Sequence, residues 1–134
     1  MLRGGCFCGD IRYETGGTPF YRTNCHCSIC RRTTGAPFVA WFSVRRSEFR
    51  LVHGAPTRFG STPKCMRSFC PRCGTQLTFE NDEAAEEIDV TTCSLDDPGQ
   101  LPSEDHTHTG SRLEWVKLAD GLPEHREARP AACS

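Results

Sequence analysis

Three cysteines lie within six consecutive positions of the sequence, where the stretch NCHCSICRR contains Cys25, Cys27 and Cys30. Thiolates this close together are typical ligands of Zn²⁺, which binds sulfur in a tetrahedral shell at about 2.3 Å. A structural zinc is closed by four protein ligands, whereas a catalytic zinc keeps three and leaves the fourth position for water or substrate. A set of three cysteines therefore predicts a zinc ion with one open position.

Four further cysteines form two short pairs that could hold a second zinc ion. Cys6 and Cys8 are separated by one residue in GGCFCG, and Cys70 and Cys73 by two residues in FCPRCGT. Proline and glycine in the second pair favour the tight turn of a zinc knuckle, and alternate residues of a strand face the same way. The two pairs predict a closed structural site of four thiolates, so we expect two Zn²⁺ per chain.

The remaining cysteines leave an alternative open for the three-cysteine site. Cys65 or Cys93 could supply a fourth ligand and close the zinc shell, with His26 or His106 as further candidates. Cys93 lies in an apparent strand, where a small buried side chain is the default interpretation. Cys133 belongs to the terminal segment, and we expect it to take no part in either site.

Arg31 and Arg32 directly follow the last of the three cysteines. Zinc with three thiolates carries one net negative charge, and a bound substrate thiolate would add another, so a nearby cation would be stabilising. Either arginine could offset this charge or clamp a substrate carboxylate, and either could instead be a solvated surface residue. His26 could transfer a proton or simply be exposed. His106 and His108 could share a strand face, but an H-x-H pair alone is a weak signal for a metal site.

Short apolar runs separated by glycine and proline indicate a fold built from strands. Residues 36–44 alternate between two faces, with Phe38, Ala40, Phe42 and Val44 on one and Val39 and Trp41 on the other. This pattern is typical of a strand covered on both sides. Similar short strand-like runs occur at residues 10–14, 19–23, 48–52, 57–61, 76–80 and 87–92.

Helical signals are confined to a turn or two over SICRRTT, and the acidic residues 81–87 suit a solvated hairpin loop. We therefore predict a single all-β domain over residues 1–123. The polar and aperiodic segment 124–134 is predicted to be a disordered tail.

Length, charge and cysteine content restrict the class of protein. A chain of 134 residues is one domain's worth of sequence and can bury a core without disulfides. Ten cysteines, with no apolar leader and no run long enough to cross a membrane, favour a soluble cytoplasmic protein with reduced thiols. Sixteen basic and seventeen acidic residues give a formal charge of −1, so we expect no nucleic-acid or membrane partner.

A series of motifs occurs in order between Gly4 and Pro123: GGCFCGDIRY, NCHCSICRRTTGAPF, RSFCPRCGTQL, SLDDP, a histidine nine residues before Trp115, and ADGLP. Together they resemble the glutathione-dependent formaldehyde-activating enzyme (GFA) family, also called the centromere protein V family. The resemblance implies an all-β fold of several short coiled antiparallel sheets organised around zinc. It places the structural zinc on Cys6, Cys8, Cys70 and Cys73 and the catalytic zinc on Cys25, Cys27 and Cys30, in agreement with the grouping by spacing.

The resemblance also implies a carbon–sulfur lyase activity like that of S-(hydroxymethyl)glutathione synthase, which interconverts this adduct with glutathione and formaldehyde. Three thiolates make zinc a weak Lewis acid that is better suited to hold a substrate thiol than to activate water. Coordination would deprotonate the thiol and fix its sulfur beside the aldehyde carbon. The expected partners are a small thiol, such as glutathione, and a small aldehyde. The alternative is a non-catalytic binding module that both zinc ions only stabilise.

Overall fold

The protein is described by a computed structural model over residues 1–129, and Cys133 lies outside the described residues. Ten strands and one short helix make up this part of the chain, which confirms the all-β prediction. The strands are β1 (Leu2–Gly5), β2 (Arg12–Thr15), β3 (Phe20–Cys25), β4 (Val39–Arg45), β5 (Phe49–His53), β6 (Thr57–Thr62), β7 (Cys65–Phe69), β8 (Gln76–Asn81), β9 (Glu87–Thr91) and β10 (Asp105–Thr107). Helix α1 covers Ser28–Thr34, the predicted SICRRTT segment. No helix among the described residues has the length and apolar character needed to cross a bilayer.

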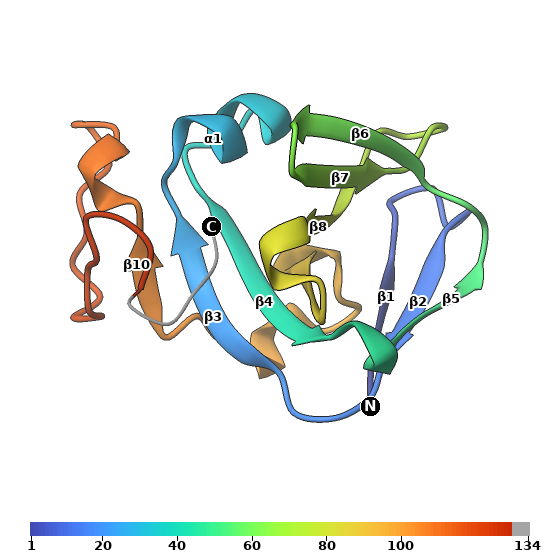
Figure 1. Ribbon diagram of the computed structural model, residues 1–134. Helices are drawn as coiled ribbons and strands as arrows, with labels where there is room; N and C mark the ends of the chain where they lie inside the picture. Colours follow the sequence, from blue (N-terminus) through green and yellow to red (C-terminus); the bar gives the residue numbers. More distant parts are fainter. Residues whose placement is uncertain (130–134) are drawn as a thin grey trace.

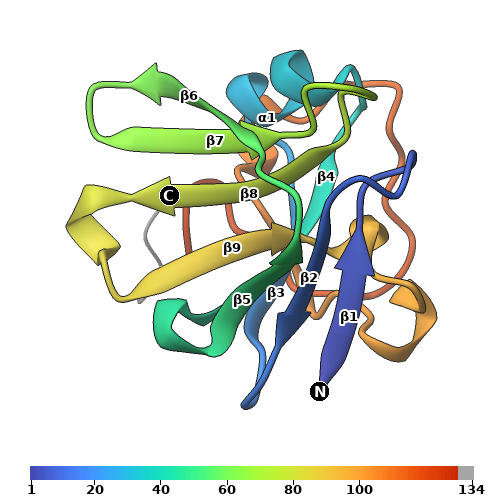
Figure 2. The same cartoon turned by 90° about the vertical axis from the view of Figure 1, so that its right-hand side faces the viewer.

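The strands form two sheets (Figure 1). The larger has seven strands in the order β10-β3-β4-β9-β8-β7-β6, and the smaller has three in the order β1-β2-β5. The neighbours in both sheets are antiparallel, apart from β10, which pairs parallel with β3 at one edge. Figure 2 looks onto the small sheet, which lies beside the middle strands of the large one. The 81–87 segment joins β8 to its antiparallel neighbour β9, as the hairpin prediction requires.

Strand β4 is covered on both faces, as its alternation predicts. Phe42 and Val44 are buried with Tyr13 in one core cluster, which also contains the four cysteines predicted to form the structural site. Trp41, on the opposite face, is buried with the three cysteines of the other group. The alternation of β4 therefore separates two packed regions, each of which contains one cysteine group.

Three strands were not predicted, namely β1, β7 and β10. Their sequences, LRGG, CMRSF and DHT, contain few apolar residues, so their pairing depends on the strands beside them. Gly4 in β1 has no room for a side chain because the Tyr13 hydroxyl and the Ser94 carbonyl oxygen occupy that space. The glycines that weaken the strand signal in the sequence thus allow the backbones to approach closely.

Residues 124–129, the described part of the segment predicted to be a tail, lie along the edge of β10. The His125 amide donates to the His106 carbonyl at 2.8 Å, and the Thr109 amide donates to the His125 carbonyl at 3.0 Å. Arg129 forms ion pairs with Glu104 and Asp105, and its guanidinium lies 5.0 Å from the ring centre of Tyr21. The edge strand and its neighbours thus supply partners for the backbone and charges of this polar segment.

Candidate functional site

The four cysteines of the predicted structural site lie together in the core. The Sγ atoms of Cys6, Cys8, Cys70 and Cys73 all lie within 4.8 Å of one another. Cys8 Sγ is 3.5 Å from Cys6 Sγ and 3.7 Å from Cys70 Sγ. Sulfurs at about 2.3 Å from a tetrahedral zinc are about 3.8 Å apart, whereas a disulfide bond joins sulfurs at about 2.05 Å. The donor set therefore fits zinc and not a disulfide.

Hydrogen bonds to these sulfurs favour their thiolate forms. The Ile11 amide donates to Cys6 Sγ at 3.2 Å, and the Cys73 amide donates to Cys70 Sγ at 3.4 Å. The Thr75 hydroxyl, 3.2 Å from Cys73 Sγ, helps to lower the pKa of the Cys73 thiol to about 5. Donors directed at sulfur are the outer contacts that a thiolate metal site needs.

The second group of cysteines is positioned by the end of β3 and the start of α1. The Sγ atoms of Cys25, Cys27 and Cys30 lie within 4.8 Å of one another. Cys27 caps the helix, and its Sγ accepts the Cys30 amide at 3.3 Å. The helix ends at Gly35, whose φ of 68° is a left-handed conformation that favours glycine. The first turn of this short helix places the Cys30 sulfur beside those of Cys25 and Cys27.

The three thiols compete for negative charge. Hydrogen bonds from the Cys25 and Cys30 thiols lower the pKa of Cys27 to about 2, whereas the Cys27 and Cys30 sulfurs raise the pKa of Cys25. Opposite shifts within one cluster arise because neighbouring thiolates repel one another. A divalent cation would allow all three to ionise, so this donor set also fits Zn²⁺.

The two cysteines considered as fourth ligands lie outside this cluster. Cys65 begins β7 and is partly buried, and Cys93 is exposed beyond the end of β9. Within residues 1–129, the donor cluster around Cys27 consists of three cysteine sulfurs. His108 is nearby, because it lines the same pocket and acts electrostatically on Cys27. Whether the shell stays open when metal is bound remains a prediction.

A buried pair of histidines supports the loop between the clustered cysteines. His26 is fully buried, which excludes the alternative of an exposed side chain. Its Nε2 lies 2.9 Å from His106 Nδ1, and His106 Nε2 lies 2.7 Å from a carboxylate oxygen of Asp120. With both imidazoles neutral, the Asp120 carboxylate accepts a hydrogen bond from His106 Nε2–H, so His106 Nδ1 accepts one from His26 Nε2–H. Burial, the largest cause, together with the neighbouring His106 lowers the pKa of His26 to about 4.

The two arginines that follow Cys30 lie on α1, and neither lines the pocket. Arg31 donates to the carbonyl oxygen of His26 at 3.3 Å and to that of Ser111. Arg32 is exposed. Arg31 therefore holds the ligand loop through backbone contacts, and the substrate-binding role of both arginines remains a prediction.

Arg67 is the cation beside the three cysteines, and sequence reasoning missed it. Its side chain comes from β7, is 4% exposed, and places Nη2 and Nη1 at 3.7 and 3.8 Å from Cys30 Sγ. The guanidinium also donates to the Thr33 hydroxyl and lies 4.8 Å from the ring centre of Phe79. Among the described residues, no carboxylate pairs with it. In the sequence, Arg67 is marked only by its position three residues before Cys70.

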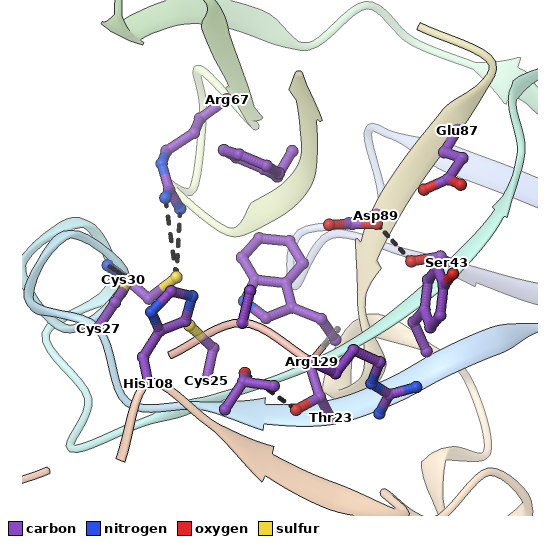
Figure 3. A pocket seen from close by; sticks show the side chains of 15 residues that line it. Thr23, Cys25, Cys27, Cys30, Ser43, Arg67, Glu87, Asp89, His108 and Arg129 are labelled. Carbon is purple, nitrogen blue, oxygen red and sulfur yellow. Dashed lines mark hydrogen bonds between the residues drawn. The ribbon is translucent and has the colours of Figure 1, made fainter. Parts of the chain in front are cut away.

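A cavity of about 90 Å³ opens on the Trp41 face of the large sheet (Figure 3). Alternate residues of three neighbouring strands line it: Thr23 and Cys25 of β3, Trp41 and Ser43 of β4, and Glu87 and Asp89 of β9. Figure 3 shows the three cysteines at one end of this pocket and Ser43, Glu87 and Asp89 at the other. All three residues of the three-cysteine group thus border a space that could admit a small molecule.

Asp89 is the most perturbed carboxyl group of the pocket. Its Oδ1 accepts a hydrogen bond from the Ser43 hydroxyl at 2.5 Å. Burial nevertheless raises the pKa of the Asp89 carboxyl to about 7, because the charged form loses its hydration. The sequence marked this residue only as part of a strand, so its place in the pocket was also missed.

Comparison with known proteins finds matches in sequence and in structure. Residues 1–111 match the family model of the glutathione-dependent formaldehyde-activating enzymes. A Halomonas elongata protein, provisionally named as such an enzyme, is 28% identical over an alignment of 127 residues, and the match covers 88% of this chain and 81% of that protein. The crystal structure of a Rhodobacter sphaeroides protein matches with a TM-score of 0.58 and 26% identity, and the match covers 92% of this chain and 99% of that one. The chain therefore belongs to the glutathione-dependent formaldehyde-activating enzyme family.

Proposed function

We propose that the protein binds two Zn²⁺ ions and acts as a carbon–sulfur lyase at Cys25, Cys27 and Cys30. The reaction would form or cleave a thiol–aldehyde adduct such as S-(hydroxymethyl)glutathione. The observation that carries this proposal is that three clustered sulfurs border a cavity, with no fourth cysteine in their cluster among residues 1–129. The family name and the name of the Halomonas relative both refer to glutathione and formaldehyde, which supports this substrate pair. The nine free cysteines described suit the reducing cytoplasm, where we place the protein.

Zinc, when bound, would provide a position that holds the substrate sulfur as a thiolate. In the cleavage direction the carbon–sulfur bond breaks with its electron pair on sulfur, the hydroxyl proton is released, and the carbon–oxygen bond becomes a carbonyl. Negative charge therefore grows on sulfur during the reaction. Arg67 places a positive charge beside Cys30, which would stabilise that change. The rings of Trp41 and Phe79 would exclude water from the same region.

Cobalt substitution tests this function, because Co²⁺ in a thiolate site has visible bands that respond to a new ligand. We expect millimolar glutathione or 2-mercaptoethanol to change the sulfur-to-metal charge-transfer bands, and the protein to accelerate exchange between thiol, formaldehyde and adduct. Cys27→Ser should abolish both effects while the four-cysteine site keeps its metal. A four-coordinate spectrum that does not respond to thiol, together with no acceleration, would instead support the non-catalytic binding module.

A further inference from the structure

The pocket has a second polar end, and strand register places it far from the cysteines. Cys25 lies opposite Val39 in the β3–β4 pair, and Ser43 lies opposite Asp89 in the β4–β9 pair. Val39 and Ser43 are four positions apart on β4, which corresponds to roughly 13 Å of strand. A ligand whose sulfur lies at the cysteines therefore needs an extended chain to reach Asp89.

The walls between the two ends are largely aromatic. Trp41 separates the cysteines from Ser43 on β4, and Phe79 packs near it at 6.2 Å between ring centres. Rings such as these accommodate a methylene chain without offering it hydrogen bonds. The polar contacts of an extended ligand are therefore concentrated at its two ends.

Two carboxyl groups, those of Asp89 and Glu87, line the distal end of the pocket. Asp89 receives one side-chain hydrogen bond within residues 1–129, from Ser43, so its second oxygen is free to accept another. Glu87 lines the same end from the same strand. The cations that face this pocket are engaged elsewhere: Arg67 with Cys30, and Arg129 with Glu104 and Asp105.

We propose that Asp89, oriented by Ser43, is a specificity-determining residue that binds an ammonium group at the distal end of an extended thiol substrate. This inference rests on the proposed function, because it assumes that the substrate sulfur lies at the cysteines. An ammonium group would pair with the carboxylate, whereas a substrate carboxylate would be repelled by Asp89 and Glu87. Burial has already raised the pKa of Asp89 to about 7, and a bound cation would favour its ionised form.

The test measures binding of straight-chain thiols to the zinc-loaded full chain by calorimetry at pH 8. At each chain length from two to eight carbons, thiols ending in an ammonium, a hydroxyl or a carboxylate group are compared. For the longer chains we expect the ammonium thiol to bind about tenfold or more tightly than the hydroxyl thiol, and the carboxylate thiol to bind most weakly. For the two-carbon thiols, which do not reach Asp89, the ammonium should give no such advantage.

Variants then assign the effect to Asp89. Asp89→Asn, which still accepts the Ser43 hydrogen bond, should remove the ammonium preference, while Glu86→Gln on the exposed surface should keep it. The length series on the unaltered protein remains decisive even if Asp89→Asn does not fold. Equal affinity for ammonium and hydroxyl thiols at every length would overturn the inference and leave the proposed function intact.

The ammonium subsite can also be tested separately if the proposed lyase function fails. If no thiol binds, the proposed function fails, and hexylammonium without a thiol is then titrated while the ¹³C resonance of the Asp89 carboxyl is followed. A saturable shift of that resonance would retain the ammonium subsite. An unchanged resonance would overturn the ammonium subsite as well.

Discussion

At the scale of single residues, Arg67 places a positive charge at the cysteine end of the pocket and Asp89 places a carboxyl group at the other end. Arg67 is buried against Cys30 without a carboxylate partner among the described residues. A buried cation needs a compensating charge, and here the thiolates are the anions within reach. Asp89, on β9, is a carboxyl group whose ionised form is stabilised mainly by the hydrogen bond from the Ser43 hydroxyl.

Replacing Arg67 should weaken metal binding at the three-cysteine site. We expect Arg67→Met to lower zinc affinity there roughly 10- to 100-fold, because a donor that supports a ligand sulfur is lost, and Arg67→Lys to have an intermediate effect. Competition with a chromophoric chelator measures the affinity. Arg58→Met, a change of an exposed arginine on β6, serves as the control. Unchanged affinity in Arg67→Met would show that the guanidinium only fills space.

Replacing Asp89 should change how stability depends on pH. The folded-state pKa of about 7 lies above the unfolded value near 3.8, so the unfolded chain ionises first and the penalty for burying this group grows as pH rises toward 7. Glu87 on the same strand adds to the shift, and Arg67 opposes it. Relative to wild type, the free energy of unfolding of Asp89→Asn should therefore increase by about 2 kcal/mol between pH 5.5 and 8.

Urea unfolding of both zinc-loaded proteins across this range measures the difference. Metal loss at low pH affects both proteins, so the difference between them isolates the carboxyl group. A difference that stays constant with pH would contradict the raised pKa.

At the scale of elements, β4 and β10 organise the site. Strand β4 contributes Phe42 to one core and Trp41 to the other, so a shift of one residue in its register would exchange the two faces. The edge strand β10 joins β3 through parallel pairing and is covered by residues 124–129. His106 at its centre connects it to His26 in the ligand loop. The C-terminal segment is therefore part of the frame around the cysteines.

Removing the Arg129 side chain should destabilise this part of the fold. Asp105 is 7% exposed in its side chain, and Arg129→Ala would remove its guanidinium partner and leave the His125 imidazole at 3.3 Å. We expect a loss of about 2 to 3 kcal/mol, since an unpaired carboxylate would stay buried. Thermal or urea unfolding measures it, with Arg126→Ala on the exposed side of the same segment as control. Equal stability of the two variants would contradict a structural role for this pair.

At the scale of the whole molecule, the two cysteine groups differ in what they join. The four-cysteine group connects segments more than sixty residues apart, since Cys8 and Cys70 lie side by side in the core. The three-cysteine group is local, because its ligands fall within one strand end and one helical turn. Loss of metal should therefore have global consequences at the first site and local ones at the second.

Two serine variants test this difference. Cys70→Ser should prevent stable folding, because metal binding at a closed site contributes on the order of 10 kcal/mol to folding in small zinc domains. Cys27→Ser should give a folded protein with one zinc ion where the wild type has two. Elemental analysis combined with circular dichroism measures both properties. A well-folded wild type with a single tightly bound metal ion would contradict two sites.

Local signals were sufficient for much of this protein. The cysteine groups, helix α1 and the two-faced strand β4 follow from spacing within a few residues, where thiol geometry and side-chain alternation act directly. Tertiary structure alone decided which distant side chains complete the pocket. Arg67 and Asp89 reach it because β7 and β9 pair into the same sheet, and residues 124–129 lie along β10 because that strand offers a free edge. These outcomes depend on long-range strand pairing, which no short stretch of sequence encodes.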